Sequence, residues 1–416
     1  MAHDDGLASG YVPSRYDREE FRPLSPEQFR SPASVQPSTL DVTVERPTIA
    51  TVVRPALPAI GLYVLFQLLA FGVLWLLSWK AGVSPGRFVG AFDGNWFLSV
   101  AEHGYTQPVT LGVDGVPVEN SLAFFPLYPA LVALLALVGI PAVAGALIVT
   151  LLAGCAAAWG LFVLGRDLAG LRVGTLLAVL WSIGPGSTVL HLAYSESLLV
   201  AFVAWTLVAV SRRQWLLTGG LASFAGLTRA GAGALLVAVG IAAIVAIVRR
   251  QDSWRPWAGA LLAPLGLVGY LAYIAVRTGR VDGWFWLQQA WHMSFDFGSF
   301  TWIQAWEGLT ANTSSWITVT ALIVLGAVAL QLWTWCTRMP LPWQVYGTIT
   351  VLIALGSSNF FQTRARYLLP AFVLTVPLAL LLAKLPNRAL AVVLPAGALV
   401  SAWYGAFLMA IVHLNP

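Results

Sequence analysis

Asp93 is the residue in this sequence that is best placed to accept a proton. It lies in "FDGNWFLSVAEHGY" (92–105), shortly after an apolar run, 56–79, that is long enough to cross a bilayer. The spacing permits a short helix with Asp93 and Trp96 on one side, among aromatic rings typical of a membrane surface. Such a carboxylate could take a proton from a hydroxyl that attacks a sugar while the leaving group departs from the opposite face. A solvated loop within an aromatic belt fits the segment equally.

Four further residues of this region are candidates for substrate binding. Glu102 and His103 could bind sugar hydroxyls, but neighbours on a helix point in different directions, so a structural role remains open for both. Tyr105 closes the segment, and Glu119 opens "ENSLAFFPLYP" (119–129), which joins a polar head to an aromatic stretch that could cradle a lipid chain.

"HLAYSESLL" (191–199) places Tyr194 and Glu196 at the mouth of an expected span. Glu196 could orient a substrate hydroxyl or pair with an arginine, although a helix N-terminal acid explains it as well. Arg229, in "GLTRAGAG", lies among small residues that let helices approach closely. We expect it to be partnered, in a structural or a phosphate-binding role.

"FFQTRARYLLPAF" (360–372) places Arg364 and Arg366 just before another span, with Tyr367 beside them. Guanidinium groups match the geometry of phosphate oxygens, so both arginines are candidates for a phosphate site. Anchoring to lipid headgroups is the competing interpretation. Tyr367 is a candidate for substrate binding.

Absent motifs narrow the chemistry. The sequence has no P-loop, no GxGxxG after a strand and no HExxH, which argues against nucleotide-driven pumps, dinucleotide enzymes and zinc proteases. It has no D-x-D pair to hold a metal-bound nucleotide sugar, and neither Cys155 and Cys336 nor the histidines have metal-ligand spacing. We expect no metal, no cofactor and no nucleic acid partner, and a donor carried on a lipid fits better.

The elements that must position these residues are membrane helices. Of the 416 residues, 58% are hydrophobic and 10% are charged, with 19 Trp, which one soluble globule could not cover. The sequence therefore predicts an all-α polytopic membrane protein of about eleven spans. The apolar runs are 56–79, 141–165, 172–190, 195–211, 214–229, 231–248, 256–277, 313–334, 343–358, 367–383 and 389–413.

The charges predict the topology. Residues 1–55 lack the apolar residues of a core and read as a disordered cytoplasmic tail, ahead of a transmembrane domain at 56–416. If the eleven runs alternate, 16 of the 23 Lys and Arg residues fall on the tail's side, as the positive-inside bias expects. The outer face then holds two large loops, 80–140 and 278–312, and all the candidate residues. The run 124–139 would invert this order as a span, so we interpret it as an interfacial or re-entrant helix.

The ordered motifs "FDGNWFLSVAEHGY", "ENSLAFFPLYP", "AYSESLL", "LTRAGAG" and "RARYLLP" resemble the PIG-V-like mannosyltransferases of the GT-C membrane glycosyltransferase superfamily. The resemblance extends over most of 56–416. Two departures are Phe92, where the family has a tryptophan, and residues 106–118, which lengthen the link between "GY" and "EN". The composition, rich in Ala, Gly, Val and Leu with only two lysines, suggests a bacterial, actinobacterial member.

This resemblance implies a GT-C fold and an inverting transfer of mannose from a polyprenyl-phosphate mannose, with Asp93 as base. The acceptor would be a hydroxyl of a lipid-linked, glycan or protein molecule on the outer face of the plasma membrane, with membrane lipids around the protein. Two other classes remain open. Many spans with charged ends also fit a lipid or solute transporter, although no inverted repeat is visible, and the chain could be an inactive GT-C relative that serves as a partner subunit.

Overall fold

The computed structural model describes residues 53–84 and 86–415. Every helix named below belongs to the unit Thr48–Pro416. The expected tail, 1–55, lies outside the described residues except at its C-terminal end.

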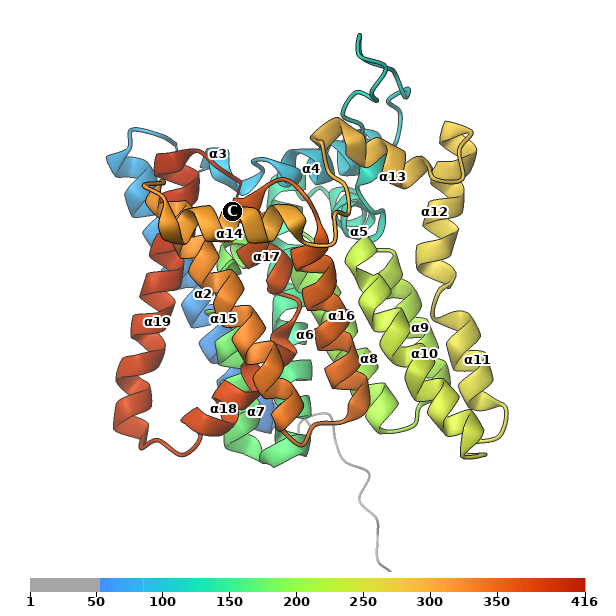
Figure 1. Cartoon of the computed structure of the whole chain (residues 1–416), viewed down its shortest axis with the longest axis vertical. Coiled ribbons are helices and arrows are strands. Elements are labelled where there is room, and N and C mark those ends of the chain that lie inside the picture. The colour runs from blue at the N-terminus through green and yellow to red at the C-terminus, as the bar shows by residue number, and fades with distance from the viewer. Residues whose placement is uncertain (1–52, 85, 416) are drawn as a thin grey trace, which may run out of the picture. The chain divides into compact units, whose positions relative to one another are not determined.

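The described residues fold almost entirely as helices, as expected (Figure 1). The helices that form the body of this unit are α2 (Leu57–Lys80), α6 (Ala142–Ala169), α7 (Leu171–Ser182), α8 (Glu196–Ser211), α9 (Trp215–Gly226), α10 (Gly233–Val248), α11 (Arg255–Leu262), α12 (Leu265–Thr278), α15 (Ser315–Cys336), α16 (Leu341–Gly356), α18 (Val376–Leu382) and α19 (Asn387–Phe407). The helices of the connecting segments are α3 (Gly86–Val89), α4 (Asp93–His103), α5 (Leu127–Ala136), α13 (Gly283–Gln288), α14 (Ser299–Thr310) and α17 (Arg364–Leu368).

Short 3₁₀ turns and one π turn join these helices. They are η2 (Arg54–Ala56), η3 (Ser121–Ala123), η4 (Ser187–His191), η5 (Ala230–Ala232), η6 (Gln289–Trp291), η7 (Phe361–Thr363), η8 (Phe372–Thr375) and the π turn η9 (Leu408–Val412). In the view of Figure 1, α3, α4, α13 and α14 lie together near the upper ends of the long helices.

Within residues 53–84 and 86–415, six helices are long and apolar enough to cross a membrane. A seventh span forms if the bent pair that contains α17 and α18, with a 75° bend between its halves, is counted together. The six helices are Arg54–Lys80, Ala142–Ala169, Ala230–Val248, Arg255–Thr278, Ser315–Cys336 and Asn387–Val412. The expected count of about eleven is therefore not confirmed, because several apolar runs form shorter helices. For example, α7 ends at Ser182, before Gly184, Pro185 and Gly186, and 12 residues rise about 18 Å.

The connecting segments contain the expected short helices. The run 124–139, interpreted from the sequence as interfacial or re-entrant, forms α5 with 10 residues. A helix of this length rises about 15 Å, roughly half the hydrocarbon core. It packs against α4 and α6.

The central helix of the bundle is α6, the most buried of the six long helices. It packs against α2, α5, α7 and α8. Gly160 shows how close these helices approach, since a Cβ at this position would lie 2.8 Å from the Cβ of Ala204 on α8. Small residues at this crossing let α8, which begins at the candidate residue Glu196, pack closely against α6.

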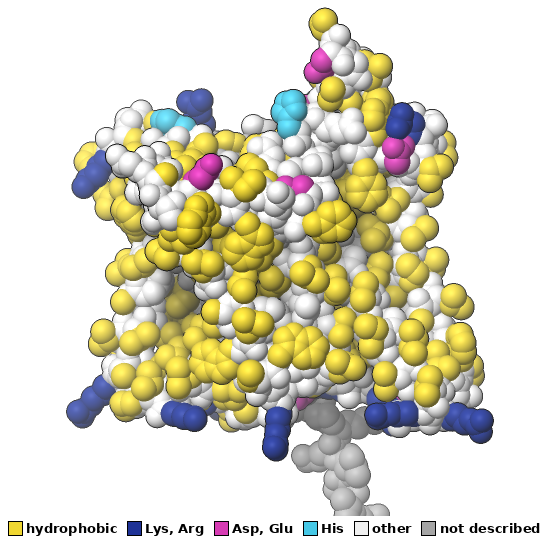
Figure 2. Space-filling model, viewed as in Figure 1, with side chains coloured by type: hydrophobic (Ala, Val, Ile, Leu, Met, Phe, Trp, Pro, Cys, Tyr) yellow, Lys and Arg dark blue, Asp and Glu magenta, His cyan; other side chains and the backbone are white. Residues whose placement is uncertain are grey.

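Cationic side chains line the lower end of the bundle, and others lie at its upper edge (Figure 2). Figure 2 shows Lys and Arg along the lower edge of a mainly hydrophobic surface. The helix-end cations assigned to the tail's side from the sequence include Arg166 at the end of α6, Arg212 and Arg213 between α8 and α9, and Arg338 between α15 and α16. This distribution is what a positive-inside protein shows.

Candidate active site

Asp93 is the first residue of α4. The backbone turn just before it, at Phe92, sets the direction of its side chain. The preceding residue, Phe92, has φ 56° and ψ −121°, a backbone conformation that residues other than glycine rarely adopt. The amide of Gly94 then donates to the carbonyl of Ala91 at 3.0 Å, which closes the first turn. Strain of this kind clusters at functional sites, where surrounding contacts hold it.

A second segment, at the start of α8, meets this turn. The amide of Ala193 donates to the carbonyl of Val89 at 2.9 Å, and the hydroxyl of Tyr194 donates to the carbonyl of Ala91 at 3.2 Å. Thr150 of α6 donates its hydroxyl to the carbonyls of Leu192 and Tyr194 at 3.0 and 3.3 Å. These bonds fix the position of Glu196, the first residue of α8, relative to Asp93.

The third segment is α17, which carries Arg366. It approaches the turn before η4 so closely that a Cβ at Gly186 would lie 2.6 Å from the amide nitrogen of Arg366. Gly186 also has φ +81°, a left-handed conformation that favours glycine. Glycine at this position therefore lets the backbone bring Arg366 to the carboxylates.

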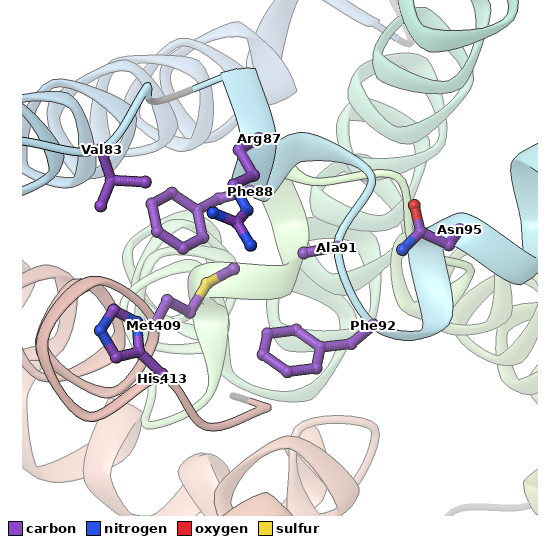
Figure 3. Close-up of a pocket in the computed structure, with 8 residues that line it drawn as sticks. All are labelled: Val83, Arg87, Phe88, Ala91, Phe92, Asn95, Met409 and His413. Carbon is purple, nitrogen blue, oxygen red and sulfur yellow. The ribbon is translucent and has the colours of Figure 1, made fainter.

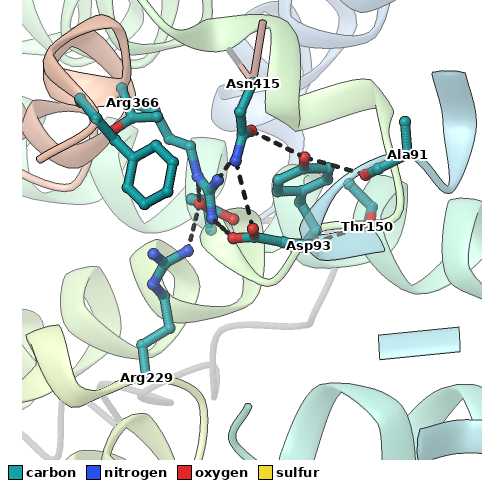
Figure 4. A network of polar contacts seen from close by, with 10 residues as sticks. Ala91, Asp93, Thr150, Arg229, Arg366 and Asn415 are labelled. Carbon is teal, nitrogen blue, oxygen red and sulfur yellow. Dashed lines mark hydrogen bonds and ion pairs between the residues drawn. The ribbon is translucent and has the colours of Figure 1, made fainter. Parts of the chain in front are cut away.

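These segments converge in a cluster of four charged side chains (Figure 4). Arg366 forms ion pairs with Asp93 through Nη2 and with Glu196 through Nε, and Arg229 forms an ion pair with Glu196 through Nη1. Arg366 and Glu196 are each 1% exposed, whereas Asp93 is 26% and Arg229 is 24% exposed. Two cations and two anions compensate each other, so the cluster carries no net charge, and only its outer members reach solvent.

Asn415, which no sequence pattern had indicated, completes the cluster. Its Oδ1 accepts hydrogen bonds from the Tyr194 hydroxyl at 3.3 Å and from Arg366 Nη1 at 3.4 Å, and its Nδ2 donates to Asp93 Oδ1 at 3.4 Å. The guanidinium of Arg366 also lies 4.6 Å above the ring of Tyr194. Asn415 thus bonds both Arg366 and Asp93, and the ring of Tyr194 lies against the guanidinium of Arg366.

The cluster sets the ionisation of Asp93. Burial raises the pKa of this carboxyl, but the charges of Arg366 and Arg229 and the hydrogen bonds from Arg366 and Asn415 outweigh that effect, so the pKa lies below its usual value. Asp93 is therefore ionised at neutral pH and can accept a proton.

The other five candidates on the first loop form no hydrogen bond or ion pair with the cluster in the described part of the chain, and two of them contact Phe124. Trp96 stacks on Phe124 with ring centroids 5.6 Å apart, and the hydroxyl of Tyr105 donates to the carbonyl of Phe124 at 2.7 Å. Glu102, His103 and Glu119 are exposed and form no bond with the cluster in the described part of the chain.

Arg364 and Tyr367 belong to the cluster to different degrees. Arg364 is fully buried, and it donates to the carbonyls of Ser357 and Asn359 and to the hydroxyl of Thr301 rather than to the carboxylates. Tyr367 lies between the two arginines, with its ring centroid 5.9 Å from the guanidinium carbon of Arg364 and 5.8 Å from that of Arg366. The structure thus brings together Asp93, Glu196, Arg229, Arg366 and Tyr194, and places Arg364 to one side.

Two cavities are lined by sequence neighbours of cluster residues: Phe92, next to Asp93, lines the first, and Ala365, next to Arg366, lines the second. The larger, of about 560 Å³, lies between α3, α4 and η9 and is lined by Arg87, Phe92, Asn95, Met409 and His413, among others (Figure 3). The smaller, of about 200 Å³, is mainly apolar and is lined by residues of α7, α15, α17 and η8. It includes Ala365 and Leu368, the neighbours of Arg366 on α17.

The side-chain types that commonly bind metals in proteins do not cluster in the described part of the chain. Residues 53–84 and 86–415 contain no group of three or more His, Cys, Asp or Glu side chains that could hold a metal ion. The cluster itself offers two carboxylates that are already paired with arginines.

Comparison with solved structures identifies the fold. The chain is similar to ArnT from Cupriavidus metallidurans bound to undecaprenyl phosphate, with a TM-score of 0.52 and 17% identity over 85% of this chain. The same ArnT in the apo state gives a TM-score of 0.47 at 16% identity over 86% of this chain. The chain spans 66% of the length of each ArnT chain. No protein-family model and no curated protein sequence matches the chain.

The chain thus has the GT-C fold, an all-helical polytopic membrane architecture, as the sequence motifs predicted. At 17% identity the likeness extends to the fold and not to the chemistry. The assignment of a reaction therefore depends on the side chains described above.

Proposed function

We propose that this protein is a membrane glycosyltransferase that takes its sugar from a polyprenyl-phosphate-linked donor. The observation that carries the proposal is the position of Asp93, an ionised carboxylate at the start of α4 that Arg366 fixes in a GT-C fold. Its neighbour Phe92 lines the larger cavity. The solved relative was bound to undecaprenyl phosphate, a lipid of the expected donor class. Mannose is the sugar that the resemblance of the motifs to the PIG-V-like family favours.

The proposed reaction is a single inverting displacement. The hydroxyl oxygen of a lipid-linked, glycan or protein acceptor attacks C1 of the sugar as the bond from C1 to the phosphate oxygen breaks. The polyprenyl phosphate leaves with the electron pair of that bond, and the hydroxyl proton passes to Asp93. A hydroxyl becomes strongly acidic as its oxygen bonds to C1, so a carboxylate of low pKa can serve as the base.

The arginines would stabilise the leaving phosphate. Arg229 bonds Glu196 through Nη1 and keeps part of its side chain exposed, and Arg366 lies against Asp93. We retain both as partners of the phosphate: Arg229 through its exposed part, and Arg366, whose nitrogens all bond protein groups, through its charge alone. A fixed cation near the phosphate favours the charge that develops during transfer. Because Arg364 donates to protein carbonyls, we propose that it shapes the loop at Ser357–Asn359 instead.

The remaining candidates would bind the substrates around this centre. We propose that Trp96, Tyr105 and Tyr367 contact the sugar or the acceptor, and that the apolar cavity against α17 receives the first part of the polyprenyl chain. Exposed Glu102, His103 and Glu119 would contact only an acceptor that extends over the loop. The site would face the outside of the plasma membrane, with the N-terminus in the cytoplasm.

A transfer assay with purified protein tests the proposal. Synthetic polyprenyl-phosphate mannose is mixed with extracted membrane lipids or glycans as acceptors, and mass spectrometry follows the release of polyprenyl phosphate and the gain of a hexose by the acceptor. We expect stoichiometric release and gain. The glucose-linked and arabinose-linked donors show whether mannose is preferred, and failure with all three would reject the transferase in favour of a transporter or a partner subunit.

A further inference from the structure

The chain turns back over the candidate site after its last helix. The helix α19 continues into η9, and His413, with φ +61°, reverses the direction of the backbone. The amide of Leu414 donates to the carbonyl of Leu408 at 2.9 Å and fixes this reversal. As a result, the side chain of Asn415 points into the charged cluster (Figure 4).

The side-chain amide of Asn415 uses both its hydrogen-bond acceptor and its hydrogen-bond donor. Arg366 donates to its oxygen, as does the Tyr194 hydroxyl, whose one hydrogen is shared with the carbonyl of Ala91. The carboxylate of Asp93 accepts from its nitrogen. An amide offers a donor and an acceptor without a charge, which neither a carboxylate nor an aliphatic side chain does. The position therefore selects for an amide.

Asp93 has its two oxygens held from different directions. Oδ2 forms the ion pair with Arg366, and Oδ1 receives the hydrogen bond from Asn415. With one bond alone, the carboxylate could rotate about its contact with Arg366. With both, its plane is fixed, and the free lone pairs face a defined direction.

We propose that Asn415 is a positioning residue for Asp93: it fixes the orientation in which the carboxylate meets the acceptor hydroxyl. This inference rests on the proposed transferase function. Misplacing a reacting group by about 1 Å can lower a rate by roughly a hundredfold, so the loss of one orienting bond has a measurable effect. The opposite role, a strap that blocks Asp93 until substrate displaces it, predicts a rise in rate when the amide is removed.

The experiment compares Asn415→Ala and Asn415→Asp with the wild-type full-length protein, and uses Asn387→Ala as the matched control. Asn387 is the same residue type, is exposed, and begins α19, the helix whose other end leads to Asn415. Release of polyprenyl phosphate is measured against donor concentration and pH, per mole of monodisperse protein. Asn415→Asp keeps the size of the side chain, so a lower rate in this variant cannot result from a cavity left by a smaller side chain.

We expect kcat to fall about tenfold in Asn415→Ala, the effect of one hydrogen bond of about 1.4 kcal/mol, while KM for the donor stays near the wild-type value. The acid limb of the kcat profile should move to higher pH, because the bond from Asn415 stabilises the ionised carboxylate. In Asn415→Asp the limb should move further, because a second carboxylate faces Asp93. Asn387→Ala should match the wild type.

Three results would overturn the inference. They are an unchanged kcat and acid limb in both Asn415 variants, a lower kcat without any shift of the acid limb, and a faster Asn415→Ala, which would indicate the strap. If the wild-type protein itself transfers no sugar from any donor, the proposed function fails and the inference fails with it. Activity in the wild type together with normal Asn415 variants rejects the inference alone.

Discussion

At the scale of single residues, Asp93 carries the proposed chemistry, and its replacement is the direct test. Asp93→Asn keeps the shape of the side chain but removes the proton acceptor. We expect turnover to fall by roughly 10²- to 10⁴-fold, as for a lost general base, with donor binding retained. Turnover and donor affinity are measured on the same purified sample. Near-normal turnover would remove Asp93 from the mechanism.

Arg366 holds both carboxylates of the cluster, so its two obvious variants should differ. Arg366→Ala leaves Glu196 and Asp93 without this cation, and breaking a buried pair costs about 3–5 kcal/mol. We expect this variant to lose most of its turnover and part of its thermal stability. Arg366→Lys keeps the charge but cannot reach every partner of the guanidinium, so partial turnover should remain.

The control for Arg366 is its neighbour. Arg364→Ala removes bonds to the carbonyls of Ser357 and Asn359 and touches neither carboxylate. It should lower the melting temperature while turnover per mole of monodisperse protein stays close to that of the wild type. A large loss of turnover in well-folded Arg364→Ala would restore Arg364 to the phosphate site, and normal turnover in Arg366→Ala would remove Arg366 from it.

The proposed donor and the arginines around it also predict how the reaction responds to the removal of metal ions. A donor with a single phosphate and a cluster of arginines leave no step that requires a divalent cation. We expect transfer to continue in excess EDTA at the rate measured without it. A loss of transfer that Mg²⁺ or Mn²⁺ reverses would show that the carboxylates or the donor have been assigned incorrectly.

At the scale of elements, the close approach of η4 to α17 positions Arg366. Gly186→Ala would place a Cβ against the backbone of Ala365 and Arg366 and would force an alanine into a left-handed conformation that costs about 1–2 kcal/mol. We expect lower stability together with a clear loss of turnover, because α17 must move.

Gly279→Ala separates these two effects. Gly279 has φ +67° but nothing within 4 Å of its Cβ position, so this variant should show the conformational cost without the loss of turnover. Thermal unfolding and turnover are measured for both variants. Equal turnover in the two would mean that Gly186 does not set the position of Arg366.

Local sequence patterns predicted some of these elements well. The spacing in 92–105 predicted a short helix with Asp93 and Trp96, and the structure has α4 from Asp93 to His103. Pairing with an arginine was one of the alternatives for Glu196, and the structure shows two such pairs. The helix was predictable because helix periodicity depends on residues close in sequence. The pairing of Glu196 was predictable because a buried carboxylate needs a cation and few cations lie near the expected span ends.

The different surroundings of Arg364 and Arg366 could not be predicted in the same way. On a helix, residues two apart do not share a face, so α17 directs the two arginines to different partners. The sequence showed only two cations before an apolar run. Likewise, nothing in the sequence near Asn415 indicates a site, because its role arises where α4, α8, α17 and the turn after η9 meet.

At the scale of the whole molecule, the proposed function requires the cluster to face the side where lipid-linked sugars are used. Arg166, Arg212, Arg213 and Arg338 mark one end of the helices, and α4, which carries Asp93, lies near the other end in Figure 1. The positive-inside bias assigns the cationic end to the cytoplasm. The site would then open to the outside, as the sequence predicts.

Cysteine labelling in sealed cells tests this orientation. Cys155 and Cys336 are first replaced by serine, and single cysteines are then introduced at three exposed positions, Thr110, Gln289 and Ser253. Thr110 and Gln289 lie in the two predicted outer loops, and Ser253 lies between α10 and α11, at the cationic end. We expect an impermeant thiol reagent to label the first two in intact cells and Ser253→Cys only after permeabilisation. The reverse pattern would place Asp93 on the cytoplasmic side, and a donor presented outside could not reach it.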